Sequence, residues 1–405
     1  MTEAELEREI LREDSEARDI IHDVNSLKNR DELQKTRWVW EFLQNAKDTD
    51  GGLGVDITFQ LDVDKITISH NGTPFETKHL IAILHKKSTK SLGGDDGTTG
   101  KYGTGFVTTH ILSKKLSISG IHKNAIGERK FEIEVDRTSA SLEETEALKQ
   151  MKISIKTTFD KINTIDSLPM AIFNTYSHSF TYYLNEGARY YAEKGLNELE
   201  KNAIFTLLIN KGDNNRKRIK SITIIRGGAS SSYEIETNSS NIAGLSYLVY
   251  GEKNGLLYKA TPNLILGLPV EKIGESYSLK SLDNQAVLFK EFPLIGTENF
   301  NLPVFIQHNN FRPTEPRDGI VTKREDELVL EFTPDLNRAC LVEFKNEYLS
   351  FLNTIIEAKV QNLHLLALSG LPSESKNYSG QEWYTGDIQK PIRNFLTAHD
   401  LVSTV

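Results

Sequence analysis

The chain has 405 residues, with 38% hydrophobic and 26% charged residues and a formal net charge of −8 at pH 7, which is typical of a globular protein of two or three domains. The acidic balance argues against a broadly basic nucleic-acid surface, and the single cysteine, Cys340, excludes an internal disulfide and a cysteine-based zinc site and fits a reducing compartment. Neither an apolar signal segment nor a stretch of roughly 20 apolar residues is found, so we expect a cytoplasmic protein that does not enter a membrane.

Two helices are predicted at the start of the chain. The first covers residues 1–30, which are charged and carry apolar residues at intervals. The second runs from about Asp31 to Thr49 and ends at the turn sequence 50–52, which is Asp-Gly-Gly. Its apolar side, which we expect to anchor the helix in a core, consists of Trp38, Val39, Phe42, Leu43 and Ala46.

One flank of the second helix carries polar oxygen atoms. Glu41 and Asn45 are four residues apart, so their side chains project from one face of a helix, and Asp48 stays near that face. Carboxylate and amide oxygens suit Mg²⁺ and a water molecule as ligands. Taken alone, this helix also fits a solvated polar face, and only the segments that follow favour a site.

A strand pair and a glycine-rich segment come next. Alternating patterns predict strands at 55–62 and 64–70, and Asn71-Gly72 predicts a tight turn after the second strand. Beyond an apolar stretch at 79–85, glycines allow the backbone to approach a ligand, and a helix starting near Phe106 would present N–H groups that favour an anion. The glycines of this run are Gly93, Gly94, Gly97, Gly100, Gly103 and Gly105.

The order of these motifs is E-x-x-x-N-x-x-D, then a strand with N-G-x-P-F, then G-x-x-G-x-G-F. In this order, from Glu41 to Phe106, the chain resembles the GHKL ATPases, which have the Bergerat nucleotide-binding fold. It looks closest to large bacterial and sacsin-like members. A P-loop is excluded, because Asp95 stands where its first glycine is required and Tyr102 follows Lys101 in place of Ser or Thr.

The resemblance implies a site for ATP and Mg²⁺. It implies that Glu41 is the general base that activates the attacking water, that Asn45 binds Mg²⁺, and that Asp48 lines the adenine side of the pocket. Lys90 falls in an expected lid that approaches the phosphates. Such positioning and charge neutralisation is most of what phosphoryl transfer requires. The glycine-rich phosphate cradle that the resemblance implies comprises Gly100, Lys101, Tyr102, Gly103, Thr104, Gly105 and Phe106.

One position departs from the family pattern. The family usually has an Asp at the end of the second strand, which accepts a proton of the adenine amino group, and this chain has His70 there, followed by Asn71 and Gly72. A neutral imidazole has one donor and one acceptor, so His70 can still contact the amino group. The amide of Asn71 is an alternative contact, and a structural turn histidine is the alternative role for His70.

Further strands are predicted at 114–121, 129–137 and 151–159, and a helical, aromatic-rich segment at 168–202. Residues 31–202 are therefore expected to form a Bergerat-type α/β two-layer sandwich, a mixed sheet with helices on one face, in an α+β chain. We expect the aromatic residues of the last segment to be core residues and not a base-stacking platform. They are Phe173, Tyr176, Phe180, Tyr182 and Tyr183.

A second, strand-rich domain is predicted at 203–335, with its first strands at 203–210, 217–227 and 231–238, and a helical C-terminal region at 336–405. The second domain resembles the transducer-type domain of GHKL proteins. This resemblance implies that Arg312 or Arg317, in a turn after an apolar strand, contacts the γ-phosphate. The alternative is a local ion pair that holds the turn.

The function expected from these features is a Mg-dependent, slowly hydrolysing ATP switch. ATP would order the lid, pair two protomers through the N-terminal segment, and rotate the second domain to control a partner or output domain. A nucleotide-gated scaffold without useful turnover and a DNA-handling clamp like MutL or MORC proteins are the alternatives, although no nucleic-acid surface is indicated. A role in bacterial anti-phage defence is an analogy to orphan GHKL proteins.

Overall fold

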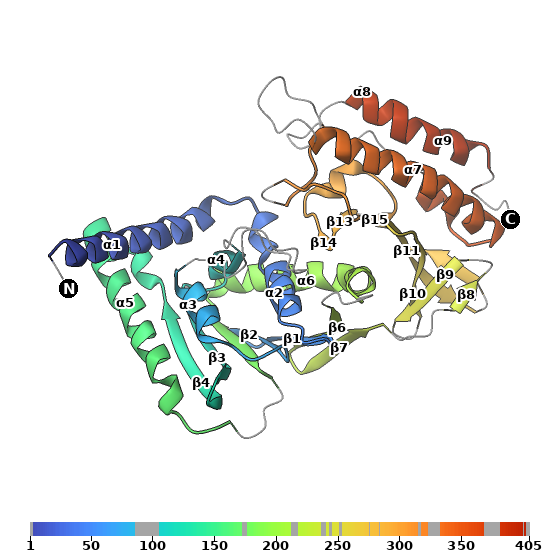
Figure 1. The fold of residues 1–405 in the computed structure, drawn as a ribbon. Coiled ribbons are helices and arrows are strands. Elements are labelled where there is room, and N and C mark those ends of the chain that lie inside the picture. Colours follow the sequence, from blue (N-terminus) through green and yellow to red (C-terminus); the bar gives the residue numbers. More distant parts are fainter. Residues whose placement is uncertain are drawn as a thin grey trace. The chain divides into compact units, whose positions relative to one another are not determined.

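The computed structural model describes residues 3–85, 105–171, 176–211, 218–235, 240–242, 245–250, 253–274, 276–282, 284–314, 317–322, 333–367, 381–399 and 401. The chain forms two compact units, one made of Met1–Glu200 and Lys211–Tyr233 and the other of Lys201–Asn210 and Glu234–Val405. Each unit combines a mixed sheet with helices, so the chain is α+β (Figure 1).

The first unit contains a seven-stranded sheet of order β4-β3-β5-β2-β1-β6-β7. The predicted pair β1 and β2 is confirmed as antiparallel, and β1 also pairs in parallel with β6, so the sheet is mixed. The strands are β1 (Val55–Leu61), β2 (Lys65–His70), β3 (Lys115–Asn124), β4 (Gly127–Asp136), β5 (His178–Tyr183), β6 (Ile219–Arg226) and β7 (Ala229–Glu234).

The two faces of this sheet differ in polarity. Along β4, Phe131, Ile133 and Val135 are buried while the residues between them are exposed. On the polar face the hydroxyls of Thr67 and Thr181 lie 3.2 Å apart across neighbouring strands. Helices α2 (Trp38–Asp48), α3 (Thr77–His85) and α6 (Glu186–Ile209) lie on one side of the sheet in Figure 1. Alternation along the strands thus separates a helix-covered face from a polar one.

The predicted N-terminal helix is confirmed as α1 (Glu3–Ser26). It packs against α5 (Glu144–Thr164), which runs beside the edge strand β4. The contact between them buries Ala17, Ile20 and Val24 of α1 against Met151. A short helix, α4 (Gly105–Thr108), follows the glycine-rich segment, as predicted from the hydrophobic residues at that point.

The second unit contains an eight-stranded sheet of order β14-β13-β15-β11-β10-β9-β8, with β12 beside β11. Its strands are β8 (Ser240–Ile242), β9 (Leu245–Tyr250), β10 (Asn254–Ala260), β11 (Leu264–Ile273), β12 (Ser276–Leu279), β13 (Leu288–Lys290), β14 (Phe292–Pro293) and β15 (Phe305–His308). The helices α7 (Thr333–Glu357), α8 (Gln381–Trp383) and α9 (Lys390–Thr397) confirm the helical C-terminal prediction. They share one buried core with the sheet, in which Phe344 and Ile388 pack with Leu266 and Ile306.

Two predictions within the first unit were wrong. Residues 151–159, predicted as a strand, lie in α5, where Ala147, Met151, Thr158 and Ile162 are buried at helical intervals. Residues 168–202, predicted as helical, contain the strand β5, which pairs with both β2 and β3. In each segment the spacing of the apolar residues fits both the helical period of 3.6 residues and the strand period of two, and tertiary packing decided between helix and strand. Phe180 and Tyr182 of β5 are buried as expected, whereas Tyr183 is exposed.

Two predictions about the start of the second domain were also wrong. Residues 203–210, predicted as a strand, are helical to Ile209 and end α6. A continuous apolar run cannot distinguish a buried strand from a buried helix. The strands β6 and β7, expected in the second domain, extend the first sheet through the parallel pairing of β6 with β1. The chain therefore returns to the first sheet after α6.

Candidate functional site

Helix α2 is held firmly on its apolar side. The five residues predicted to anchor it are all buried, with exposures of 2% or less. The Trp38 ring packs edge-on against Phe42 and Phe59, and its indole N–H donates to the carbonyl oxygen of Tyr191 at 3.1 Å. The opposite flank, which carries Glu41 and Asn45, is only partly buried. Because the apolar side is anchored, the polar flank has a defined position.

Glu41 is paired with a cation. Its Oε1 lies 3.4 Å from Nη2 of Arg37, one turn earlier in the chain, and both side chains are less than 15% exposed. Burial lowers the pKa of Arg30, and the charge of Glu41 is the strongest influence that opposes this. The Glu41 carboxylate thus forms an ion pair with Arg37, and its charge acts favourably on that of Arg30. The i, i+4 spacing of Arg37 and Glu41 was the signal in the sequence for this contact.

Asn45 and Asp48 lie further along the same helix, and both are half-buried. The amide of Asn45 makes no side-chain hydrogen bond within the described part of the chain. Its oxygen is therefore available to a hard cation such as Mg²⁺. Among the described residues, no group of three or more His, Cys, Asp or Glu side chains is gathered to hold a metal.

The turn after β2 packs against the C-terminal end of α2. The N–H of Thr73 donates to the carbonyl oxygen of Thr49 at 2.8 Å. A Cβ on Gly72 would lie 1.7 Å from the Thr49 hydroxyl oxygen, so only glycine allows this close approach. The turn therefore lies against Thr49, the residue that follows α2.

Asn71 is not free to contact a base. Its Nδ2 donates to Oδ2 of Asp56 at 2.8 Å, and its Oδ1 accepts from the N–H of Asp56 at 2.8 Å. Both functions of the amide are used to tie the end of β2 to the start of β1. This leaves His70 as the side chain of the turn that faces the buried layer.

His70 is 3% exposed and stacks on His178, with ring centroids 4.1 Å apart. Burial lowers the pKa of His70 to about 3. Burial, with His70 and His79 nearby, also holds the pKa of His178 well below its ordinary value. Both imidazoles are therefore neutral at pH 7. His178 was not identified from the sequence, because its strand was predicted as helix.

Most of the predicted phosphate cradle, with Lys90, Gly100, Lys101, Tyr102, Gly103 and Thr104, lies outside the described residues. Its last two residues are described. Gly105 begins α4, and the ring of Phe106 lies 6.5 Å from Phe42 and 5.9 Å from Phe180, centroid to centroid. The end of the glycine-rich segment is thus attached to α2 and to the sheet.

In the second unit, a lysine that the sequence did not indicate lies close to the predicted arginines. Lys290 is at the turn between β13 and β14, and its ammonium donates to the carbonyl oxygen of Asn309. Burial lowers its pKa, and the charges of Arg312 and Arg317 act in the same direction while Glu291 opposes them. These three cations form the basic cluster of the second unit.

The backbone around this basic cluster is well fixed. The Arg317 guanidinium donates to the carbonyl oxygen of Lys290 at 2.8 Å, and Arg317 itself has a φ of +53°. The N–H of Glu291 donates to the side-chain oxygen of Gln307 at 2.8 Å. The Arg312 side chain is exposed, and its N–H donates to Asn337 at 2.8 Å. Arg317 thus holds the turn, whereas Lys290 and Arg312 supply charge.

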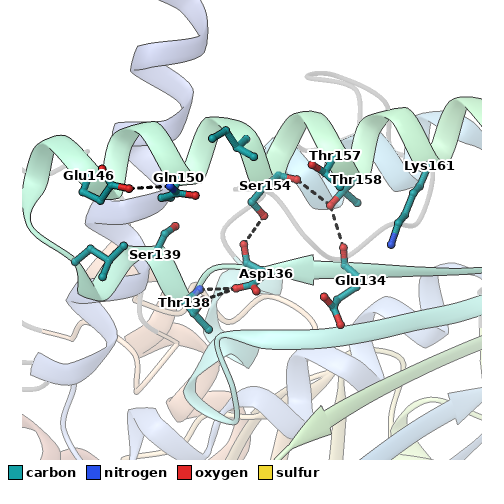
Figure 2. Close-up of a pocket in the computed structure, with 12 residues that line it drawn as sticks. Glu134, Asp136, Thr138, Ser139, Glu146, Gln150, Ser154, Thr157, Thr158 and Lys161 are labelled. Carbon is teal, nitrogen blue, oxygen red and sulfur yellow. Dashed lines mark hydrogen bonds between the residues drawn. The ribbon is translucent and has the colours of Figure 1, made fainter.

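A groove of about 570 Å³ between β4 and α5 includes none of the predicted site residues (Figure 2). Here Ser154 and Thr158 of α5 donate to the carbonyl oxygens of Asp136 and Glu134 at 2.6 and 2.9 Å. The helix thereby satisfies backbone groups that the edge strand β4 would otherwise leave open to another strand. The groove therefore lies where α5 covers the edge strand β4.

Within the described residues, no helix has the length and apolar character needed to cross a membrane. No family model and no curated protein matches the chain.

Proposed function

We propose that the first unit is a Bergerat-type domain that binds a nucleoside triphosphate with Mg²⁺ and hydrolyses it slowly. The convergence of three motifs that are separate in the sequence carries this proposal. The turn after β2 is hydrogen-bonded to the end of α2 through Thr73 and Thr49, and α4 meets α2 through the rings of Phe106 and Phe42. Residues near 41–48, 70–72 and 105–106 thus border one region.

Each side chain has a role suited to its surroundings. Asn45, without a side-chain partner in the described residues, would hold the magnesium ion, which supplies charge neutralisation to the phosphates when bound. Glu41 would be the general base, since a carboxylate can accept a proton from an attacking water.

The pairing of Glu41 with Arg37 also favours a second candidate function. One oxygen of the Glu41 carboxylate lies 3.4 Å from the Arg37 guanidinium, so this oxygen is already engaged and is less accessible to an attacking water. If this pair persists in the nucleotide complex, nucleotide binding holds a conformation without useful turnover. The first unit would then be a nucleotide-gated scaffold.

Phosphate release and nucleotide binding, measured separately on Glu41→Gln, test the catalytic role. We expect turnover to fall by about a hundredfold or more, the range for loss of a general base, while binding of Mg-ATP is kept. Glu193→Gln is the matched control, since Glu193 is on α6 with an exposed carboxylate. Wild-type turnover in Glu41→Gln would reject the base assignment, and absence of turnover in the wild-type protein, with binding intact, would favour the scaffold.

The same proposal includes a transducer-like role for the second unit. Lys290 and Arg312 of the basic cluster are the candidates for contact with the terminal phosphate, and Arg317 is the positioning residue, because its guanidinium binds the backbone of Lys290. A cation placed on a transferring phosphoryl group stabilises the charge that develops there.

Lys290→Met and Arg312→Ala should lower turnover more than nucleotide affinity, and Arg317→Ala should lower turnover by displacing Lys290. Lys272→Met is the control, because that lysine is exposed on β11. Unchanged turnover in all three variants of the basic cluster rejects the contact with the terminal phosphate.

Dimerisation through the N-terminal segment belongs to the same proposal. Helix α1 buries the side of Ala17, Ile20 and Val24 on its own unit, while Leu11 is 65% exposed. An ATP analogue should raise the molar mass in solution to that of a dimer, and Leu11→Asp should weaken this change. A monomer at all nucleotide concentrations would reject dimerisation.

A further inference from the structure

The sheet of the first unit has two edge strands, β4 and β7 (Figure 1). At the β4 edge, the hydroxyls of Ser154 and Thr158 on α5 donate to carbonyl oxygens of the strand. At the β7 edge, within the part of the chain that the structure describes, no hydrogen bond joins the backbone to any element other than β6. An uncovered edge presents a row of N–H and C=O groups with which another strand can pair.

The strands β6 and β7 are joined by a turn of two residues. Gly227 and Gly228 both have positive φ, +54° and +87°, as a type I′ turn requires. The flanking residues, Arg226 and Ala229, then form a pair that exchanges two backbone hydrogen bonds. Pairs of this kind recur at every second residue along the hairpin, so the turn sets the register of β7 on β6.

This register decides which backbone groups of β7 face outward. Ser232 falls opposite Thr223, in a pair that exchanges no backbone hydrogen bonds, and the two hydroxyls lie 3.3 Å apart. The N–H and C=O of Ser232 therefore point away from β6. The same holds two residues away for Ser230 and Glu234. Each of these residues thus places one donor and one acceptor on the open edge.

The side chains of β7 do not protect this edge. Natural edge strands usually carry a lysine, a proline, a bulge or an inward-pointing charge that hinders pairing. The strand reads Ala-Ser-Ser-Ser-Tyr-Glu, with its only charge at the last residue, and its first four residues are all exposed. Small uncharged side chains let another strand approach without a steric clash and without repulsion between like charges.

We propose that β7 pairs in antiparallel fashion with β7 of a second copy of this chain, about a two-fold axis at Ser232. Each Ser232 then faces its own counterpart, and each Ser230 faces Glu234 of the other copy. The three pairs exchange about six backbone hydrogen bonds, two from each pair, so every outward group of both strands is matched. The two Glu234 carboxylates lie at opposite ends of the paired segment, so like charges do not face each other. The strand is thus complementary to itself.

This contact differs from the dimerisation proposed for α1. Helix α1 packs against α5 beside β4, at the other edge of the sheet, and its pairing depends on nucleotide. The β7 contact uses backbone groups that are already in place and buries little apolar surface, so it should form without nucleotide and be weak, with a Kd of about 100 µM. Well below this protein concentration, only the nucleotide-dependent contact should change the molar mass.

Sedimentation equilibrium of the nucleotide-free protein, between about 5 and about 500 µM, tests the pairing. The mean molar mass should rise from that of a monomer toward that of a dimer. Ser232→Pro removes the outward N–H at the centre without removing a bond to β6, and should weaken association by about tenfold or more, because each copy loses one hydrogen bond. Ser232→Thr keeps this N–H and is the matched control, with association like that of the wild type. A wild-type protein that stays monomeric throughout, or a folded Ser232→Pro protein that associates equally well, overturns the inference.

Charged variants test the two-fold register. Ser232→Lys and Ser232→Glu should each associate more weakly than the wild type, because like charges would face each other at the axis. An equimolar mixture of the two should associate at least as strongly as the wild type, since the facing charges then attract. A mixture no stronger than its components overturns the register, and these variants decide if Ser232→Pro does not fold.

The variant Leu11→Asp separates the two interfaces. It should leave the association of the nucleotide-free protein unchanged, because Leu11 is on α1. A loss of association in this variant would assign the contact to α1 and overturn the role of β7. None of these measurements contains a nucleotide, so failure of the proposed function and failure of this inference are observed separately.

Discussion

Acidification should destabilise the first unit through three buried histidines. Burial lowers the pKa of His70 to about 3 and, with help from the charge of Arg137, that of His110 to about 4. Burial and the nearby His70 and His79 also hold the pKa of His178 well below 6.5. In the unfolded chain these groups take up a proton near pH 6.5, but in the folded unit they do not. The stability they contribute is therefore complete above pH 6.5 and is lost as the pH falls toward their folded pKa values.

The size of the effect follows from the two pKa values. Below pH 6.5 each such histidine costs about 1.4 kcal/mol per pH unit, so between pH 7 and pH 5 His70 and His110 each remove about 2 kcal/mol from the free energy of unfolding. Their joint loss of about 4 kcal/mol is a large part of the typical 5–15 kcal/mol stability of a domain. His178 adds a loss of the same sign.

Urea unfolding at pH 7, 6 and 5, followed by tryptophan fluorescence, measures this loss. A Trp383→Phe background leaves Trp38 and Trp40, which are both buried in the first unit, as reporters. The pH dependence should become less steep in His70→Gln and should not change in His22→Gln. A free energy of unfolding that falls by less than about 1 kcal/mol between pH 7 and pH 5 would refute the reasoning.

Three further predictions concern the packing and the hydrogen bonding of buried groups. Gly195→Ala places a Cβ 2.6 Å from Nε1 of Trp38 and should lower the free energy of unfolding by about 2 kcal/mol. The control, Gly187→Ala on the same helix, places a Cβ no closer than 3.6 Å to any atom and should be neutral or stabilising. Equal thermal midpoints for the two variants would contradict this prediction. Tyr348→Phe removes a buried hydroxyl that has no partner among the described residues, so the thermal midpoint should stay or rise; a marked fall would show that the hydroxyl is bonded. Asn337→Ala leaves three partly buried backbone groups, the N–H and carbonyl of Arg312 and the carbonyl of Val321, without their partner, and should cost about 3 kcal/mol in urea unfolding. A loss under about 1 kcal/mol would mean that water replaces the amide.

Local sequence was sufficient for the parts of the site that lie within one element. The burial of Trp38, Phe42 and Leu43, and the opposite flank with Glu41 and Asn45, follow from helical spacing. The pair β1 and β2 followed from the alternation of apolar and polar residues on both sides of the connection at 62–64. In these segments the spacing of the apolar residues fits either a helix or a strand but not both, so the secondary structure could be predicted without knowledge of the packing.

Tertiary structure decided where apolar patterns fit two periods. Residues 151–159 and 203–210 became helix, and 178–183 became a strand, because of the neighbours on which each segment packs. The pattern of apolar and polar residues along the sequence also cannot show which side chains of elements far apart in the chain come into contact. The closeness of Lys290 to Arg312 and Arg317 is one such case.

The sequence by itself determined the chemistry that is available, namely a carboxylate and an amide on one helix, an Asn-Gly turn and a glycine-rich segment. Only the tertiary structure decided how these groups are engaged. It uses Asn71 to bind Asp56 and sets His70 on His178. The physical reason is that charge pairing, hydrogen-bond satisfaction and burial depend on contacts between residues far apart in the chain, which spacing along the sequence does not specify.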